Sequence, residues 1–485
     1  MTHVRVAVIG AGFSGLGTAI KLVQSGRDDF VLFERGSDLG GTWRVNTYPG
    51  CACDVPSQVY SFSFELNPDW SHTYARQPEI QKYLLHVAEK HDLRRRIVFN
   101  ADVTDAQWNG TVWEIETTAG SWTADVLVAG TGGLSEPSFP DIPGISAFEG
   151  TLFHSAEWNH DWTAAGQRVG VIGTGSSAIQ FVPHVQREAQ RLVLFQRTAS
   201  WVLPRIDKEI SSARKSAYRR FPALQRLVRA LVYTRTEIPL IGFRYDRRVL
   251  KLGEKMGTKL LEEQVADPVL REKLRPRFDL GCKRVLLSNH YYPALAADNA
   301  DVVTDHIVQV VADGVVTEDA AGVRTTHELD ALILGTGFKV QDPPIAHKVS
   351  VDGVTLAEHW KKSGMAALHG VAVAGFPNLF FLMGPNTALG HNSVLLMIEA
   401  QIDHLIKALD LLDRQGMRTI EPRADVQAAY DKRIQRELQP TVWNSGGCNS
   451  WYLDEQGRNT VLWPTFTFTY MRELRAFKPE EYVLG

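Results

Sequence analysis

Two glycine-rich loops are the residues whose spacing most directly suggests chemistry. Gly10-Ala11-Gly12-Phe13-Ser14-Gly15 has the spacing GxGxxG, and Gly173-Thr174-Gly175-Ser176-Ser177-Ala178 repeats it with Ala in the last position. In such loops the first Gly allows a tight turn, the second lets the backbone approach a pyrophosphate, and the third position packs helix on strand. Each loop follows an apolar strand and precedes a helical pattern, so the sequence predicts two dinucleotide-binding sites.

The residues at the end of the next strand distinguish the two sites. The strand after the first loop ends in Glu34, whose carboxylate would accept hydrogen bonds from ribose hydroxyls and repel a 2'-phosphate. The strand after the second loop ends in Arg197 and Thr198, which can donate to a 2'-phosphate, although an Arg that merely ends a strand is the alternative. The first site therefore predicts FAD or NAD and not NADP, and the second favours NADPH. One FAD site and one NADPH site would make a flavoenzyme that takes hydride from NADPH.

The cysteines do not favour a dithiol reductase. The chain has four, of which Cys51 and Cys53 form a CxC pair and Cys282 and Cys448 are isolated. A dithiol site has CxxC spacing, and four scattered residues are too few for a disulfide framework. We therefore expect free thiols in a reducing compartment, with electrons delivered to oxygen or to an external acceptor.

Length and charge set outer limits. The chain has 485 residues, which predicts two or three domains, and a net charge of -3, which favours neither a nucleic-acid nor a membrane partner. The first strand begins almost at Met1 and no apolar run reaches the length of a membrane span. We expect a soluble, cytoplasmic protein without a signal peptide and without a metal site.

The elements that must position the loops follow from the apolar pattern. "VRVAVIG" and "RVGVIG" are expected strands, each followed by a helix and a second strand. "DVLVAGTGG" and "DALILGTGF" are strands ending in Gly-Thr-Gly, expected to close the first unit, and residues 103–122 predict a β-meander around Asn-Gly. The segment 208–279 is basic with leucines at helical spacing, typical of an inserted helical subdomain with a solvated face; a membrane-surface role is the alternative.

Two further motifs carry a family resemblance. "GGTWRVNTYPGCACD" (40–54) fits [AG]GxWxxxx[FY]P[GM]xxxD, and "FEGTLFHSAEWN" (148–159) fits FxGxxxHxxxW. Together with the two loops, they resemble the fingerprints of type I Baeyer–Villiger monooxygenases, over nearly the whole chain. The family usually has Pro or Asp after the fingerprint Trp, where this chain has Asn159.

The resemblance implies an α/β fold with two Rossmann-like dinucleotide-binding domains, for FAD and NADPH, and an inserted helical subdomain. The expected FAD domain spans 1–145 and 336–485, the second part also carrying substrate-pocket elements after Pro385 and in "SGGCNSWYLDEQGRNTVLWP". The expected NADPH domain spans 146–207 and 280–335, interrupted by the helical insertion at 208–279.

The resemblance also assigns residues. Arg284 matches the Arg that stabilises a negatively charged C4a-peroxyflavin, and Asp54 matches the acid that positions it. Implied FAD contacts are Gly10, Gly12, Ser14, Gly15, Glu34, Thr42, Trp43, Asp54, Tyr60 and Val103, with Arg284. Implied NADP contacts are Gly173, Thr174, Gly175, Ser176, Ser177, Gln180, Arg197, Thr198 and Lys283. The structural alternatives are core packing for Trp43, a helix cap for Asp54 and a solvated cation for Arg284.

The implied reaction inserts one oxygen atom of O2 beside a ketone carbonyl to give an ester or lactone, and the same peroxide could oxidise sulfides. The runner-up is a flavin-containing monooxygenase that oxygenates nitrogen or sulfur, and a non-catalytic NADP-sensing protein is a third class. The ketone and the oligomeric state do not follow from the sequence.

The segment from Phe148 to Trp158 lies between the two predicted sites, so acid–base catalysis by its His is not expected. We interpret it as a hinge in which Phe148 and Trp158 make apolar contacts, Gly150 gives backbone freedom and His154 donates or accepts a linking hydrogen bond. The alternative is a rigid packed linker.

Overall fold

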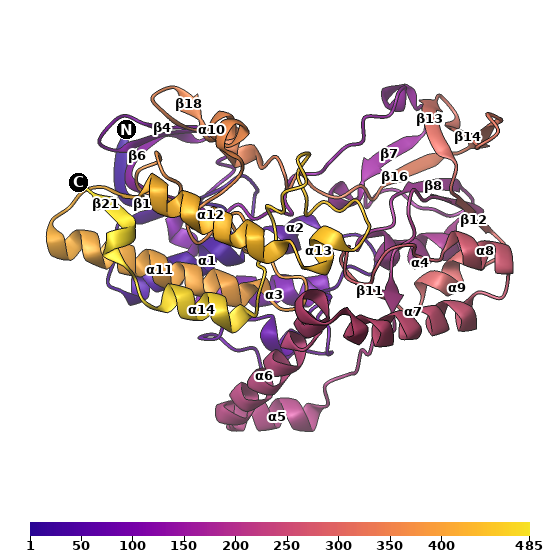
Figure 1. The fold of residues 1–485 in the computed structure, drawn as a ribbon, viewed down its shortest axis with the longest axis horizontal. Helices are drawn as coiled ribbons and strands as arrows, with labels where there is room; N and C mark the ends of the chain where they lie inside the picture. The colour runs from indigo at the N-terminus through magenta and orange to yellow at the C-terminus, as the bar shows by residue number, and fades with distance from the viewer.

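Two sheets, each built around one glycine loop, organise the chain (Figure 1). The computed structural model describes residues 1–485. The first sheet has the strand order β18-β17-β4-β5-β6-β1-β2-β3, with β19 also paired to β6. Its strands are β1 (Thr2–Ile9), β2 (Phe30–Glu34), β3 (Ile97–Phe99), β4 (Val103–Trp108), β5 (Trp113–Thr117), β6 (Gly120–Ala129), β17 (Val349–Val351), β18 (Val354–Thr355) and β19 (Leu379–Phe381).

The second sheet is fully parallel, in the order β12-β9-β8-β16-β7. Its strands are β7 (Thr151–His154), β8 (Arg168–Ile172), β9 (Arg191–Phe195), β12 (Ala300–Val303) and β16 (Ala331–Leu334). A separate antiparallel sheet lies in the same part of the chain and consists of β13 (His306–Val311), β14 (Gly314–Glu318) and β15 (Arg324–Glu328). The predicted α/β class with two parallel cores is confirmed, whereas the predicted domain boundaries stay predictions.

Helices pack on both sheets. Those of the first and last parts of the chain are α1 (Phe13–Gln24), α2 (Thr42–Val45), α3 (Gln77–Lys90), α10 (Leu356–Ser363), α11 (Val394–Gln415), α12 (Ala424–Leu438), α13 (Val442–Ser445) and α14 (Thr467–Arg475). α1 packs on α11, and α11 on α14, so the C-terminal third covers the first glycine-loop helix. The second loop is followed by α4 (Ala178–Glu188), which packs on α9 (Tyr291–Leu295).

Each glycine loop packs against a Gly-Thr-Gly turn. Gly10 and Gly173 have φ of 97° and 118°, a region that favours glycine. A side chain at Gly10 would lie 2.9 Å from the carbonyl oxygen of Gly130, and one at Gly173 would lie 2.3 Å from that of Gly335. The expectation that both turns close the first unit is wrong for the second turn, because β16 pairs with β8 and β7 of the second sheet. Periodicity identified both strands but could not assign them to a sheet.

The chain crosses between the sheets twice, at 135–140 and 335–340. The two crossings lie side by side: Ser138 donates from its backbone to the Gly337 carbonyl at 2.9 Å, and Lys339 to that of Glu136 at 3.0 Å. The two sheets are therefore connected by one paired linker, whose first crossing precedes the Phe148–Trp158 segment in the chain.

Residues 208–279 form the predicted helical insertion, with α5 (Ser212–Arg220), α6 (Pro222–Glu237), a π-helical turn (Ile241–Tyr245), α7 (Leu250–Gln264) and α8 (Pro268–Lys273). In Figure 1 α5 and α6 project at the bottom of the view. β10 (Val202–Leu203) and β11 (Leu286–Leu287) pair in parallel and join the two ends of the insertion. No helix combines the length and the apolar character needed to cross a bilayer.

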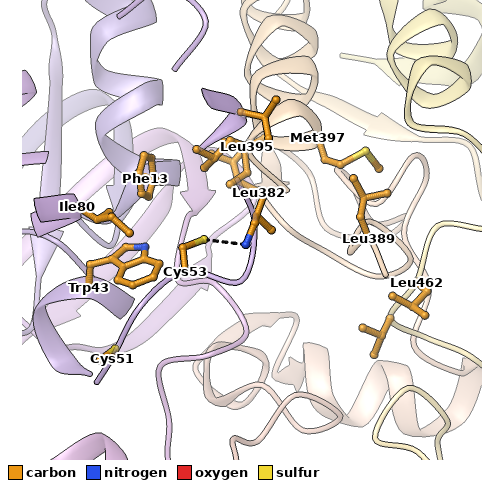
Figure 2. Packing of buried hydrophobic residues seen from close by; sticks show 14 of the residues in the cluster. Phe13, Trp43, Cys51, Cys53, Ile80, Leu382, Leu389, Leu395, Met397 and Leu462 are labelled. Carbon is orange, nitrogen blue, oxygen red and sulfur yellow. Dashed lines mark hydrogen bonds between the residues drawn. The ribbon is translucent and has the colours of Figure 1, made fainter. Parts of the chain in front are cut away.

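One apolar core joins the first and last parts of the chain. Figure 2 shows Phe13 of α1 and Trp43 of α2 near Leu382 and Leu395 from the C-terminal third. The two free cysteines, Cys51 and Cys53, are buried in the same cluster. This packing brings the first fingerprint and the C-terminal third to one site.

Candidate active site

A large cavity lies over the first glycine loop. Its walls include the predicted residues Gly10, Gly12, Ser14, Glu34, Thr42, Trp43, Tyr60, Val103 and Arg284. Gly15 does not line it; a side chain there would lie 1.8 Å from the Gly10 carbonyl oxygen, so this glycine is needed for helix packing. The sequence reasoning therefore assembled one site from segments far apart in the chain.

Glu34 is buried at the end of β2, and its carboxylate accepts from the backbone N–H groups of Ala11 (2.9 Å) and Gly36 (2.8 Å). The acid thus holds the loop in shape while it faces the cavity. A carboxylate oxygen has two lone pairs, so both oxygens keep acceptor capacity for ribose hydroxyls. These residues fit an adenine dinucleotide that lacks a 2'-phosphate.

An aromatic pair forms another wall. The Trp43 indole N–H donates to the Tyr60 hydroxyl at 3.0 Å, and the two rings meet edge to face. Trp43 is 7% exposed, so it both packs in the core and lines the cavity. The alternative of core packing and the predicted role are compatible for this residue.

Asp54 and Arg284 form a bidentate ion pair. Arg284 donates from Nε to Asp54 Oδ2 at 2.6 Å and from Nη2 to Oδ1 at 2.7 Å. Burial raises the pKa of Asp54, but the charge and hydrogen bonds of Arg284 outweigh this and hold that pKa below its ordinary value. The charge of Asp54 in turn raises the pKa of Arg284. Asp54 caps no helix and Arg284 is not a solvated cation, so neither structural alternative holds.

The C-terminal segments complete the cavity. Leu389, Val394 and Leu395 from the segment after Pro385 line it, as do Tyr452 and Leu462 from the later segment. Tyr452 is 1% exposed, and burial raises the pKa of its hydroxyl to about 12, so it stays protonated. Sequence reasoning named the segment but not Tyr452, because nothing in an aromatic cluster shows which ring faces the cavity.

A second, basic cavity lies at the end of β9. It is lined by the predicted Arg197 and Thr198 and also by Lys273, Arg275 and Arg277, against one acid, Glu272. These five side chains fit an anionic group such as a 2'-phosphate. The additional cations come from the end of the insertion, whose basic composition the sequence showed but whose folding back onto β9 it did not.

Lys283 lies beside this region. Its ammonium donates to the Thr198 hydroxyl at 2.9 Å, and burial followed by the nearby Arg197 charge lowers its pKa. The second glycine loop, Gly173 to Ser177, joins β8 to the N-terminus of α4. A side chain added at Gly175 would meet nothing within 4 Å. An open glycine loop at a helix start suits a phosphate.

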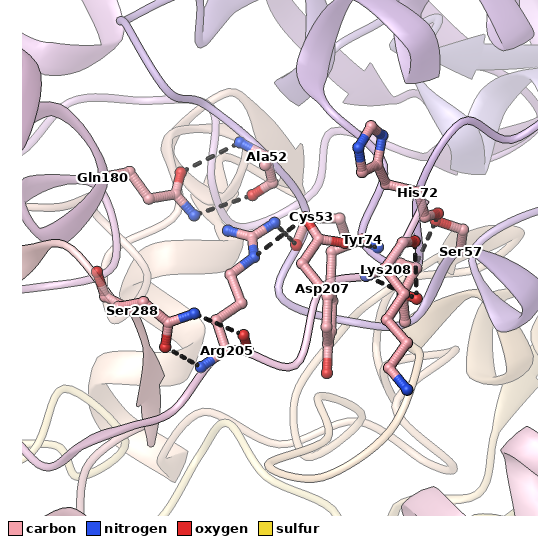
Figure 3. A network of polar contacts seen from close by, with 12 residues as sticks. Ala52, Cys53, Ser57, His72, Tyr74, Gln180, Arg205, Asp207, Lys208 and Ser288 are labelled. Atoms are coloured by element: carbon pink, nitrogen blue, oxygen red, sulfur yellow. Dashed lines mark hydrogen bonds and ion pairs between the residues drawn. The ribbon is translucent and has the colours of Figure 1, made fainter. Parts of the chain in front are cut away.

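Gln180 makes different contacts from those expected of a phosphate loop. Its side chain accepts from Ala52 N–H at 3.2 Å and donates to the Ala52 carbonyl at 3.0 Å, bridging α4 to the first fingerprint (Figure 3). Arg205 makes a parallel link to the Cys53 carbonyl at 3.4 Å and also lowers the pKa of Asp54. The residues that hold the backbone beside Asp54 in place, Gln180 and Arg205, therefore come from the part of the chain that forms the second sheet and from the segment that leads from it to the insertion.

The expectation of four free thiols is wrong. Cys282 and Cys448 form a disulfide, while Cys51 and Cys53 remain free. The bridge lies next to Lys283 and Arg284 and ties them to the C-terminal segment that carries Tyr452. A separation of 166 residues concealed this pairing from sequence reasoning.

His154 lies at the crossing between the sheets. It is 0% exposed, its Nδ1 accepts from Ala156 N–H at 3.1 Å, and its ring packs against Phe139 and Phe338, one from each crossing segment. Burial lowers the pKa of His154 to about 4, so the imidazole is neutral at pH 7. The expected linking hydrogen bond is absent, because the contact to Ala156 is local and Nε2 has no partner; the ring contacts the two crossing segments by packing alone.

The other motif residues pack nearby. Phe148 is buried, and Trp158 packs edge to face on Phe153. The idea that Gly150 provides backbone freedom does not hold: it lacks a positive φ, and an added side chain would lie 2.5 Å from the Asp330 carbonyl oxygen. Glycine is required at position 150 because the Asp330 carbonyl and the Phe148 ring leave no room for a side chain.

Known proteins share this arrangement. A family model described as flavin-binding monooxygenase-like matches residues 3–237. Two curated relatives, both named Baeyer–Villiger monooxygenase, are 47% identical (Pseudomonas aeruginosa) and 48% identical (Streptomyces coelicolor), each over 99% of this chain and 92% of its own length. The chain belongs to the Baeyer–Villiger monooxygenase family.

Solved structures agree with this assignment. A steroid monooxygenase bound to NADP superposes with a TM-score of 0.87 at 29% identity, over 100% of this chain and 99% of that one. The OTEMO complex with FAD and NADP gives a TM-score of 0.88 at 26% identity, over 99% of both chains. The predicted family, fold and enzyme class are confirmed: this Baeyer–Villiger family member is an NADPH-dependent flavin monooxygenase.

His154→Ala should slow turnover and increase the share of NADPH oxidised without oxygenated product, while FAD stays bound. The reason is that the substitution removes the ring between the two linkers and leaves Ala156 N–H without its acceptor. Product yield per NADPH, measured beside His306→Ala on exposed β13, tests this. If rate and yield both match wild type, the segment is a packed linker.

Proposed function

We propose that the chain inserts one oxygen atom of O2 beside the carbonyl of an apolar ketone to give an ester or lactone, by the peroxyflavin route, and that it also oxidises sulfides. The observation that carries the proposal is the Arg284 guanidinium, which lines the cavity that the first glycine loop and apolar C-terminal residues share. Asp54 does not line this cavity itself but holds Arg284 there by a bidentate ion pair.

The enzyme uses FAD and NADPH as cofactors. When bound, the flavin supplies the oxygen activation, and this chain's residues supply positioning and charge. Glu34 and the first loop would hold FAD, and the basic cavity with Arg197 would hold NADPH. Both sites therefore fit the cofactor that the sequence assigned to them.

Arg284 would stabilise negative charge that develops above the flavin. A guanidinium fixed in advance by two hydrogen bonds needs no reorganisation when that charge appears, which is the main source of electrostatic catalysis. Asp54 would keep the guanidinium oriented, and its pKa is lowered chiefly by the charge and hydrogen bonds of Arg284, with a smaller contribution from the charge of Arg205. The apolar walls at Leu389, Leu395 and Leu462 would exclude water and accept an apolar ketone.

A substrate panel tests the reaction. Purified FAD-loaded enzyme is given NADPH, O2 and separate cyclic ketones, aryl ketones, amines and sulfides, and products are identified by mass. Esters or lactones one oxygen heavier than the ketone support the proposal. Turnover of amines and sulfides without any ester would favour the nitrogen- or sulfur-oxygenating alternative.

Arg284→Ala should bind FAD and oxidise NADPH but give no ester, with peroxide released instead, because the stabilising cation is lost. Arg284→Lys should recover only part of the yield, since Lys keeps the charge without the bidentate geometry. Arg95→Ala, an exposed ion-pair residue, is the control. A normal ester yield from Arg284→Ala would remove Arg284 from this role.

Arg197→Ala should raise the KM for NADPH by about tenfold or more and leave the KM for NADH nearly unchanged, because one charge-assisted contact to the 2'-phosphate is lost. Arg191→Ala, at the other end of β9 and paired with Asp301, should change neither value. An unaltered preference for NADPH in Arg197→Ala would assign 2'-phosphate recognition to Arg275 or Arg277.

A further inference from the structure

Helix α6 has its apolar side chains on the outside. Its protein-facing side carries Gln225, Arg229 and Glu237, which are all buried. Its opposite side carries large apolar residues, and the same face continues through the next turn. These residues, called the outer stripe, are Leu224, Leu227, Leu231, Ile238, Ile241 and Tyr245, between 40% and 63% exposed. Surface helices normally show the reverse pattern.

The polar face docks onto the protein. Arg229 donates to the carbonyls of Gln58 and Ser61, both at 3.0 Å. Glu237 accepts from the Asn392 side chain at 2.6 Å and from Thr467 N–H at 3.0 Å. These contacts fix the rotation of α6, so the outer stripe cannot turn inward.

The outer stripe forms one continuous line. Its members are three, four or seven residues apart along the chain, a spacing that places helical residues on one face. At its end Tyr245 stacks on Phe466, which stacks on the exposed Phe468 of α14. A contiguous apolar surface of this kind marks an interaction site.

The charge around the stripe is one-sided. Between residues 210 and 245 the sequence has eight basic residues and a single acid, the buried Glu237. Arg214, Arg220, Arg226 and Arg235 are exposed, and none takes part in an ion pair. The net charge of -3 for the whole chain therefore conceals a local cationic surface.

This charge distinguishes between two occupants. A second copy of the chain, paired stripe to stripe, would bring Arg226 and Arg235 of both copies together, and like charges repel. The exposed acids at the edges of the stripe, Asp69 and Asp246, are already paired with Arg219 and Arg248. A lipid surface with anionic phosphates offers an apolar layer for the stripe and negative charges for the arginines.

We infer that the outer stripe binds the surface of an anionic bilayer. The axis of α6 lies along the interface, the leucines and isoleucines enter the acyl boundary, and Arg226 and Arg235 contact the phosphates on either side. With 16 residues α6 does not cross the bilayer, so the attachment is peripheral.

The test uses FAD-loaded enzyme sedimented with vesicles of phosphatidylcholine and phosphatidylglycerol in equal parts, or of phosphatidylcholine alone. Wild type should bind the anionic vesicles at least about tenfold more tightly, and added salt should weaken this binding. The double variant Leu227→Glu, Leu231→Glu should lose about tenfold or more of it, because both charges would enter the apolar layer. Arg226→Gln with Arg235→Gln should weaken anionic binding only.

The charge-matched control is Val323→Glu with Val354→Glu, one exposed position in a loop and one on the short strand β18, and it should bind as wild type does. Flavin absorbance and melting temperature, unchanged in every variant, confirm folding. Wild type that stays in the supernatant with anionic vesicles overturns the inference. The inference is also overturned if the protein dimerises in solution and the leucine substitutions abolish the dimer, because the stripe would then bind a second copy. A control variant that loses vesicle binding as much as the leucine variant overturns it too.

Discussion

The bidentate ion pair of Asp54 and Arg284 is the contact on which the rest of the site depends. It joins residues 230 positions apart, one from the first fingerprint and one from the segment that follows the helical insertion. Neither residue lies in a helix or a central strand, so each is placed by its surroundings. A partly buried ion pair of this kind requires good geometry, since the desolvation of both charges must be offset.

The supports of the pair come from every part of the chain. Gln180 and Arg205 hold the backbone at Ala52 and Cys53 from the side of the second sheet. Arg284 is held on both sides along the chain. The strand pairing of β10 with β11 fixes the backbone just after it, at Leu286, and the Cys282–Cys448 bridge fixes the backbone just before it. Movement of one sheet relative to the other would therefore reach the ion pair, and for this reason we expect a change in the paired linker around His154 to affect the reaction.

Sequence reasoning succeeded where local backbone geometry dictates residue type. The loops at Gly10 and Gly173 need φ values that only glycine adopts easily. Glu34 stands at the end of the strand that follows the first loop, where its carboxylate accepts from the loop's Ala11 N–H. Sequence reasoning failed where contacts are long-range. The disulfide, the role of Gly150 in packing, the docking of Gln180 on Ala52 and the pairing of β16 with the second sheet all depend on segments far apart in the chain. The basic, leucine-rich insertion was visible in the sequence, but only the burial of Arg229 and Glu237 shows that its apolar side faces outward.

A double-mutant cycle on the ion pair tests the central claim most directly. The fraction of oxidised NADPH that ends in oxygenated product is measured for Asp54→Ala, Arg284→Ala and the double variant, on a ketone that wild type converts. If Asp54 acts by holding Arg284, the double variant should lose about as much yield as Arg284→Ala alone, because residues that act as a unit are not additive. Losses that multiply independently would contradict the account.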